Sequence, residues 1–208
     1  MQVTYTHIKQ VKRAAKALKD SYPTLKLGQR QDLAAVQVLG VRNYHEAVRR
    51  YDSWLMLHVD VSQDRYGTSK CTLCDFSFAA DLKEDREAHQ VVHERFHEAV
   101  EALGYCPAIH LQRERLKDEG SKKAFSTEGL ETQINGALMV FRGWFDRSLC
   151  NAIYDEYWRK HPTFDLYVSM ILDSLGDMYK ELKPLLKMRY GYRPGEIKPG
   201  QTNWYPGR

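Results

Sequence analysis

Two cysteines and two histidines have the types and the spacing of a zinc site. Cys71 and Cys74 are two residues apart, and His89 and His93 follow them in the pattern C-x2-C-x14-H-x3-H. Zinc prefers four thiolate or imidazole ligands at the corners of a tetrahedron. Because four residues advance an α-helix by little more than one turn, His89 and His93 are expected on one helix face. The spacing therefore predicts one structural zinc ion, held by a two-cysteine hairpin and a two-histidine helix.

The sequence around these four residues resembles a known module. The segments C-T-L-C-D-F-S-F and E-D-R-E-A-H-Q-V-V-H, within residues 71–93, are similar to the zinc finger of the sister-chromatid cohesion acetyltransferases. Shared features are the fourteen-residue gap, an aromatic residue after the second cysteine and an acidic residue ahead of the first histidine. The resemblance implies a zinc-binding finger. It does not extend to the acetyltransferase domain, because the chain has no glycine-rich acetyl-CoA loop after a strand.

An overlapping motif suggests a different use of zinc. The run His93-Glu94-Arg95-Phe96-His97 has the H-E-x-x-H form of helical zinc proteases, in which Glu94 would be the general base. The charged residues inside and just after the motif are unlike those buried helices, and the motif leaves both cysteines without a role. A zinc hydrolase remains an alternative function, and a ligand set in which His97 replaces His89 also stays open.

The predicted histidine helix is acidic. Between residues 81 and 105 there are seven aspartates and glutamates against three lysines and arginines, a net charge of −4. Attraction to phosphate supplies much of the affinity of proteins for DNA, so a duplex would repel this helix. We therefore expect the finger to stabilise the fold or to bind protein, and not to read bases.

Positive charge is concentrated near the N-terminus. Residues 1–50 contain ten lysines and arginines against three acidic residues, a net charge of +7, whereas the whole chain carries +4. This distribution predicts a nucleic-acid surface on short helices. The candidate nucleic-acid-binding residues are Lys12, Arg13, Lys16, Arg42, Arg49 and Arg50. The alternative is that these side chains only form the solvated face of a helical bundle.

The same basic stretch has two further likenesses. Its turn at Gly40-Val41 partly matches a helix-turn-helix. Residues 11–50 also resemble a three-helix N-terminal module of bacterial mobile-element proteins, in which an A-x-x-L helix precedes a G-[VYF]-x-[ND]-[YW]-H turn; here these are residues 15–18 and 40–45. The second resemblance implies a bacterial, phage or plasmid origin and identifies no activity.

Hydrophobic periodicity and helix breakers predict a mainly α fold in five parts. The parts are a basic three-helix unit (1–60), a zinc-finger-like hairpin and helix (61–111), a linker or hinge (112–129), an antiparallel helical hairpin (130–188) and an irregular tail (189–208). The second helix of the hairpin is expected to be kinked at Pro184, and the aromatic tail is expected to lie along the hairpin.

Composition and missing motifs limit the function classes. The 208 residues are 43% hydrophobic and 28% charged, as in a globular protein. With no secretory signal, no membrane span and isolated Cys106 and Cys150, we expect a reduced, cytoplasmic protein without membrane partners. The chain has neither a nucleophile elbow nor a phosphate loop. The leading hypothesis is a non-enzymatic zinc protein that docks on nucleic acid or a nucleoprotein complex. The alternative is a protein-interaction module or inhibitor of a host machine.

Overall fold

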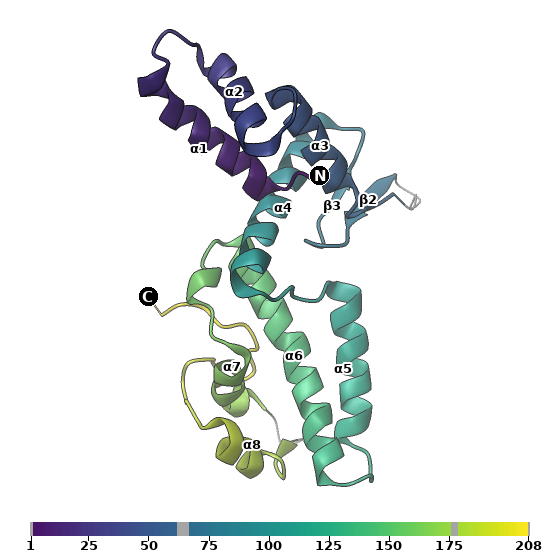
Figure 1. Cartoon of the computed structure of the whole chain (residues 1–208). Helices are drawn as coiled ribbons and strands as arrows, with labels where there is room; N and C mark the ends of the chain where they lie inside the picture. Colours follow the sequence, from purple (N-terminus) through teal and green to yellow (C-terminus); the bar gives the residue numbers. More distant parts are fainter. Residues whose placement is uncertain (1, 62–66, 176–178, 208) are drawn as a thin grey trace. The chain divides into compact units, whose positions relative to one another are not determined.

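The computed structural model describes residues 2–61, 67–175 and 179–207 and confirms that the fold is mainly α. The described residues form eight α-helices, two short 3₁₀ helices and one three-stranded antiparallel sheet (Figure 1). They group into two compact units, Met1–Glu98 (unit 1) and Ala99–Arg208 (unit 2). None of the described helices has the length and apolar character needed to cross a membrane.

Three helices open unit 1, as the sequence predicts. They are α1 (Tyr5–Ser21), α2 (Leu27–Leu39) and α3 (Tyr44–Met56). Gly40 ends α2 with φ +65°, a left-handed conformation that glycine adopts without steric strain. Asn43 begins α3, because its Oδ1 accepts a 2.8 Å hydrogen bond from the backbone N–H of Glu46. Their shared core is built from buried apolar residues, among them Ile8, Val11, Ala15, Ala34, Ala35, Ala47, Tyr51 and Leu55.

A small sheet and a long helix complete the zinc-finger-like part. The elements are β1 (Val59–Asp60), β2 (Thr68–Cys71), β3 (Ser77–Ala79) and α4 (Lys83–Leu103). The strands pair antiparallel in the order β1-β2-β3, with Ser69 opposite the buried Phe78. The expected hairpin and helix are therefore both present. Residues 62–66, which belong to the predicted zinc-finger-like part, lie outside the described residues.

The predicted linker over residues 112–129 is wrong. Most of it is helix α5 (His110–Ala124), which packs along α6 (Leu130–Tyr154) (Figure 1). Its many charged residues cover the exposed side of a helix, whereas Gly120 and Ala124 are buried. A Cβ added to Gly120 would lie 2.7 Å from the carbonyl oxygen of Gly136, so the two helices meet backbone to backbone at these glycines.

The helical hairpin predicted over residues 130–188 is wrong in its second half. In place of one long helix, the chain has η1 (Trp158–Lys160), α7 (Phe164–Ile171), η2 (Leu172–Ser174) and α8 (Lys183–Tyr190). Leu175 leaves the helical conformation with φ −75° and ψ 117°. Pro184 lies in the first turn of α8, where its missing N–H removes no helix bond, so it begins a helix and kinks none. Residues 176–178 lie outside the described residues.

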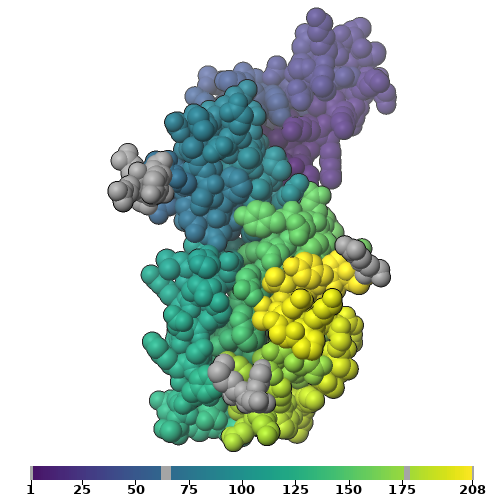
Figure 2. Space-filling model, turned by 180° about the vertical axis from the view of Figure 1, so that it is seen from behind, coloured from purple at the N-terminus to yellow at the C-terminus, as the bar shows by residue number. Residues whose placement is uncertain are grey.

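The C-terminal tail lies on unit 2 and is irregular, as predicted. Figure 2 shows it in yellow against the green residues of the same unit. The backbone N–H of Trp204 donates a 2.9 Å hydrogen bond to Ser148 Oγ, and the hydroxyl of Tyr167 donates one of 2.5 Å to the carbonyl oxygen of Thr202. The Trp204 side chain is buried. The tail is therefore part of the packing of unit 2.

Candidate metal centre

The four residues predicted to bind zinc form one buried cluster in unit 1. Cys71 ends β2, Cys74 lies in the turn before β3, and His89 and His93 lie one turn apart on α4. None of the four is more than 1% exposed, and one ligand atom from each lies within 4.8 Å of the others. A tetrahedral zinc ion holds its sulfur and nitrogen ligands about 3.5 Å apart. Cys71 Sγ lies 3.4 Å from His93 Nδ1. The cluster can therefore hold a metal ion.

Local backbone contacts place the two thiols. The N–H of Cys71 donates a 2.9 Å hydrogen bond to the carbonyl oxygen of Phe76, and the N–H of Asp75 donates one of 3.0 Å to the carbonyl oxygen of Cys71. Asp75 adopts φ +62°, a left-handed conformation in which aspartate is more common than most residues. Lys70 Nζ pairs with the Asp75 carboxylate at 2.7 Å. These contacts close the turn and bring both sulfur atoms to one side of it.

Aromatic packing places the histidines. The ring of His89 stacks on Phe78 with centroids 4.2 Å apart, and the ring of His93 makes an edge contact with Trp54 at 5.2 Å. The Nε2 atoms of His89 and His93 are buried and have no hydrogen-bond partner among the described residues. Leaving such polar atoms unsatisfied costs about 1–3 kcal/mol each. The buried cluster therefore combines two thiols with two imidazoles whose hydrogen bonding is incomplete, a donor set that fits a metal ion.

The ionisation of the cysteines agrees with this environment. The Cys74 thiol and the two imidazoles donate hydrogen bonds toward Cys71, which lowers the pKa of the Cys71 thiol. The pKa of the Cys74 thiol is raised, because this thiol donates its hydrogen bond to Cys71 and because it is buried. Without a cation the buried pair therefore keeps one proton. A metal ion that binds both thiolates must displace that proton.

Among the described residues, the two histidines of the H-E-x-x-H motif do not lie in one metal-ligand group. His97 is outside the four-residue cluster, and its ring makes an edge contact with Trp54 at 4.8 Å. Glu94 accepts hydrogen bonds from the Tyr51 hydroxyl at 3.0 Å and from Gln90 Nε2 at 2.9 Å. Catalytic zinc sites keep one coordination position open for water. Here the four buried residues would supply four protein ligands to one ion, which is the number a closed structural site uses.

Trp54 is a residue of the site that sequence reasoning missed. It comes from α3, and its ring contacts the rings of His58, His93 and His97 at centroid distances of 5.2, 5.2 and 4.8 Å. In the sequence, Trp54 is one of several apolar residues of an amphipathic helix. The only signal that it is buried is that it lies on the same helix face as Tyr51 and Leu55. Trp54 connects the three-helix core to the metal ligands.

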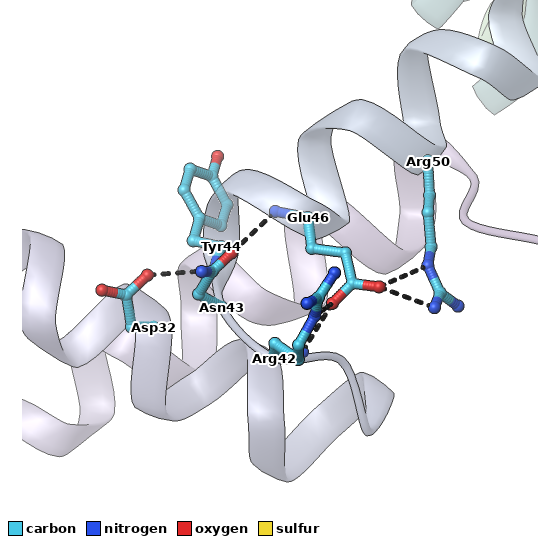
Figure 3. A network of polar contacts seen from close by, with 6 residues as sticks. All are labelled: Asp32, Arg42, Asn43, Tyr44, Glu46 and Arg50. Atoms are coloured by element: carbon cyan, nitrogen blue, oxygen red, sulfur yellow. Dashed lines mark hydrogen bonds and ion pairs between the residues drawn. The ribbon is translucent and has the colours of Figure 1, made fainter.

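The predicted nucleic-acid-binding residues lie in two different environments. Lys12, Arg13 and Lys16 on α1 and Arg49 on α3 are exposed. In contrast, the carboxylate of Glu46 lies between Arg42 and Arg50 and pairs with both, at 3.2 and 2.7 Å (Figure 3).

We compared the chain with protein-family models, curated proteins and solved structures, and none of them matches it.

Proposed function

We propose that this chain is a non-enzymatic, zinc-containing protein that docks on nucleic acid or a nucleoprotein complex through the exposed face of α1. The observation that carries the proposal is a row of cationic side chains on that face. Lys12, Arg13 and Lys16 are exposed, and among the described residues none of them forms an ion pair. Their charge is therefore available to an external partner.

The geometry of α1 turns these residues toward the same side. Successive residues of an α-helix are rotated by about 100°, so Lys9, Lys12, Arg13, Lys16 and Lys19 fall within an arc of about 120°. The buried residues of the helix, Ile8, Val11 and Ala15, lie on a different arc. Of the five cations, Lys9 is paired with Glu98 at 3.2 Å. The remaining four form a continuous basic stripe along α1.

The stripe on α1 is a better candidate than the arginines at the start of α3. Glu46 partly neutralises Arg42 and Arg50, so these two contribute less to a phosphate-binding surface than their number suggests. Arg49 is different. Together with Arg50 and Ser53 it lines an open hollow of about 480 Å³, large enough for a backbone phosphate. We assign Arg49 to the binding surface as a secondary contact.

Zinc has a structural role in this proposal. The ion would join the β2–β3 turn to α4 through Cys71, Cys74, His89 and His93, which are all buried. Small hairpins of this kind gain much of their folding free energy from the metal. The acidic character of α4 argues against base reading by the finger itself.

The proposal is tested by neutralising the stripe. The variant K12Q/R13Q/K16Q is compared with the wild type and with the control R115Q/K122Q/K160Q, which removes three exposed charges from unit 2. Fluorescence anisotropy measures binding to single-stranded DNA, duplex DNA and duplex RNA at several salt concentrations. For a duplex DNA, each lost phosphate contact reduces the slope of log K against log salt by about 0.9. We expect the magnitude of this slope to fall by about 2 to 3 in the stripe variant and to stay at the wild-type value in the control.

Two results would overturn the proposal. One is the absence of binding to all three probes even at low salt. The other is an unchanged salt slope and affinity in the stripe variant. Either result favours the alternative function, a protein-interaction module without nucleic-acid contact.

A further inference from the structure

Unit 2 contains a hollow that the proposed function does not use. It has a volume of about 310 Å³ and lies between the end of α4, the middle of α6 and the segment from η1 to α7. Its walls are mostly aromatic and aliphatic, with Phe145, Leu149, Trp158, Pro162 and Phe164 among them. Known small-molecule sites are concave, mainly apolar and about 300 Å³ or larger. We call this hollow the Arg142 pocket, after the one residue of its lining that carries a formal charge at neutral pH.

Aromatic rings hold the Arg142 guanidinium in place. Its central carbon lies 3.5 Å from the ring centroid of Phe164 and 5.4 Å from those of Tyr105 and Phe145. A guanidinium stacked on rings keeps its N–H groups at the edge of its plane available for hydrogen bonds. A cation that is partly desolvated and pre-oriented in this way binds an anion more strongly than a surface lysine does.

The carboxylate best placed to neutralise Arg142 is engaged elsewhere. Asp146 follows it by four residues on α6, the usual spacing of a helical ion pair. The Asp146 carboxylate instead accepts hydrogen bonds from the Tyr105 hydroxyl at 2.5 Å and from the backbone N–H of Ala108 at 3.1 Å, and it is 1% exposed. No ion pair to Arg142 is present among the described residues. Asp146 therefore acts on Arg142 only through space and forms no ion pair with it among the described residues, so the guanidinium has no carboxylate in direct contact.

The histidine of the lining, His161, is neutral. His161 Nδ1–H donates to the carbonyl oxygen of Pro162 at 3.1 Å, and its Nε2 accepts from Ser148 Oγ at 2.9 Å. Burial lowers the pKa of His161 to about 4. Ser148 itself is fully buried and also accepts the Trp204 N–H, so this pair anchors the tail. Arg142 alone sets the electrostatic preference of the pocket.

We infer that the Arg142 pocket binds a small organic carboxylate with an aromatic body. The carboxylate would pair with the guanidinium edge of Arg142, and the ring would pack against Trp158, Leu149 and Pro162. The volume of about 310 Å³ suits one such molecule. The inference is independent of the nucleic-acid surface, which lies in unit 1.

Isothermal titration with indole-3-acetate and its uncharged analogue indole-3-acetamide tests the inference. We expect saturable binding of the acid, and the amide should bind about tenfold more weakly or worse because it lacks the charge-assisted pair. The R142Q variant should lose this discrimination. R147Q, which removes an exposed arginine five residues further along α6, should bind the acid as the wild type does. Amide chemical shifts should change for residues 158–164 when the acid is added.

Circular dichroism and the urea midpoint establish that R142Q is folded. If R142Q does not fold, an F164L variant replaces it, since leucine keeps the apolar wall but removes the ring under the guanidinium; weaker binding of the acid is expected. The inference is overturned if neither compound binds at millimolar concentration, if acid and amide bind equally well, or if the folded variants leave the affinity for the acid unchanged.

Discussion

Glu46 decides which of the basic residues are available to a partner. Its carboxylate accepts the backbone N–H of Arg42 at 2.8 Å and pairs with the guanidinium groups of Arg42 and Arg50 (Figure 3). The Arg42 N–H and the Arg50 side chain, in this order of importance, lower the pKa of Glu46 to about 2. One buried acid therefore stabilises the start of α3 and partly neutralises two arginines, of which Arg42 stays 82% exposed.

Glu46→Gln should reduce the stability of the folded protein at pH 7. In the unfolded chain the carboxyl ionises near pH 4.5, and in the folded protein near pH 2. Because the folded state holds the proton less tightly, the stabilisation by Glu46 is complete above about pH 4.5 and is lost as the pH falls toward 2. Urea unfolding should give a lower midpoint for E46Q at pH 7, and this difference from the wild type should shrink below pH 4.5.

The matched control is Glu119→Gln, which removes an exposed glutamate paired only with Lys123 on the surface of α5. Exposed pairs of this kind contribute little to stability, so E119Q should unfold near the wild-type midpoint. An E46Q midpoint equal to the wild type at pH 7, or a difference that grows in acid, would show that the arginine contacts of Glu46 are not stabilising.

At the scale of elements, the pairing of α5 with α6 depends on glycines at the helix contact. A Cβ on Gly136 would lie 2.3 Å from the backbone nitrogen of Ala124 and 2.6 Å from the carbonyl oxygen of Gly120. Backbone atoms cannot move aside as a flexible side chain can. The close approach of the two helices therefore requires glycine at this position.

Gly136→Ala should consequently destabilise unit 2 by about 1–3 kcal/mol, the usual cost of overpacking. Gly28→Ala should change the free energy of unfolding in the opposite direction. A Cβ at this position meets no atom within 4 Å, and Gly28 has no left-handed φ. That substitution should stabilise α2 by about 0.4–1 kcal/mol. Chemical unfolding followed by circular dichroism measures both. A G136A variant as stable as the wild type would contradict the packing of α5 on α6.

The same elements show what the sequence can predict. The periodicity of apolar residues and the helix breakers were sufficient for the three helices α1 to α3, and the C-x2-C and H-x3-H spacing was sufficient for the four-residue cluster. The linker prediction was wrong, because charge density does not distinguish a loop from a helix that buries glycine and alanine. Periodicity also could not indicate that the second apolar stripe is interrupted at Leu175.

Long-range contacts were the other feature that the sequence did not reveal. Nothing in the spacing brings Trp54 to the histidines, since it lies 39 positions before His93 in the sequence and only tertiary packing joins them. Tertiary packing also determines the partner of Asp146. Its spacing from Arg142 within α6 would favour an ion pair, but its carboxylate accepts a hydrogen bond from Tyr105. Such choices depend on which partners the fold brings close.

At the scale of the whole molecule, the chain divides into two compact units, and among the described residues the candidate metal-ligand group lies in unit 1. Removal of a structural metal should therefore act on unit 1 alone. Hydrogen exchange with and without a zinc chelator should show faster exchange in residues 67–98 and unchanged exchange in α5 and α6. Equal acceleration in both units, or none in residues 67–98, would contradict a local structural role for the metal.

The most direct test of the account is the zinc content of the purified chain, measured by elemental analysis after exhaustive dialysis. We predict about one zinc per chain for the wild type and for H97Q, and none for C71S/C74S or H89Q. A folded wild type that takes up no zinc would contradict the account. So would zinc that is retained by C71S/C74S and lost in H97Q, since His93, Glu94 and His97 would then belong to a catalytic centre.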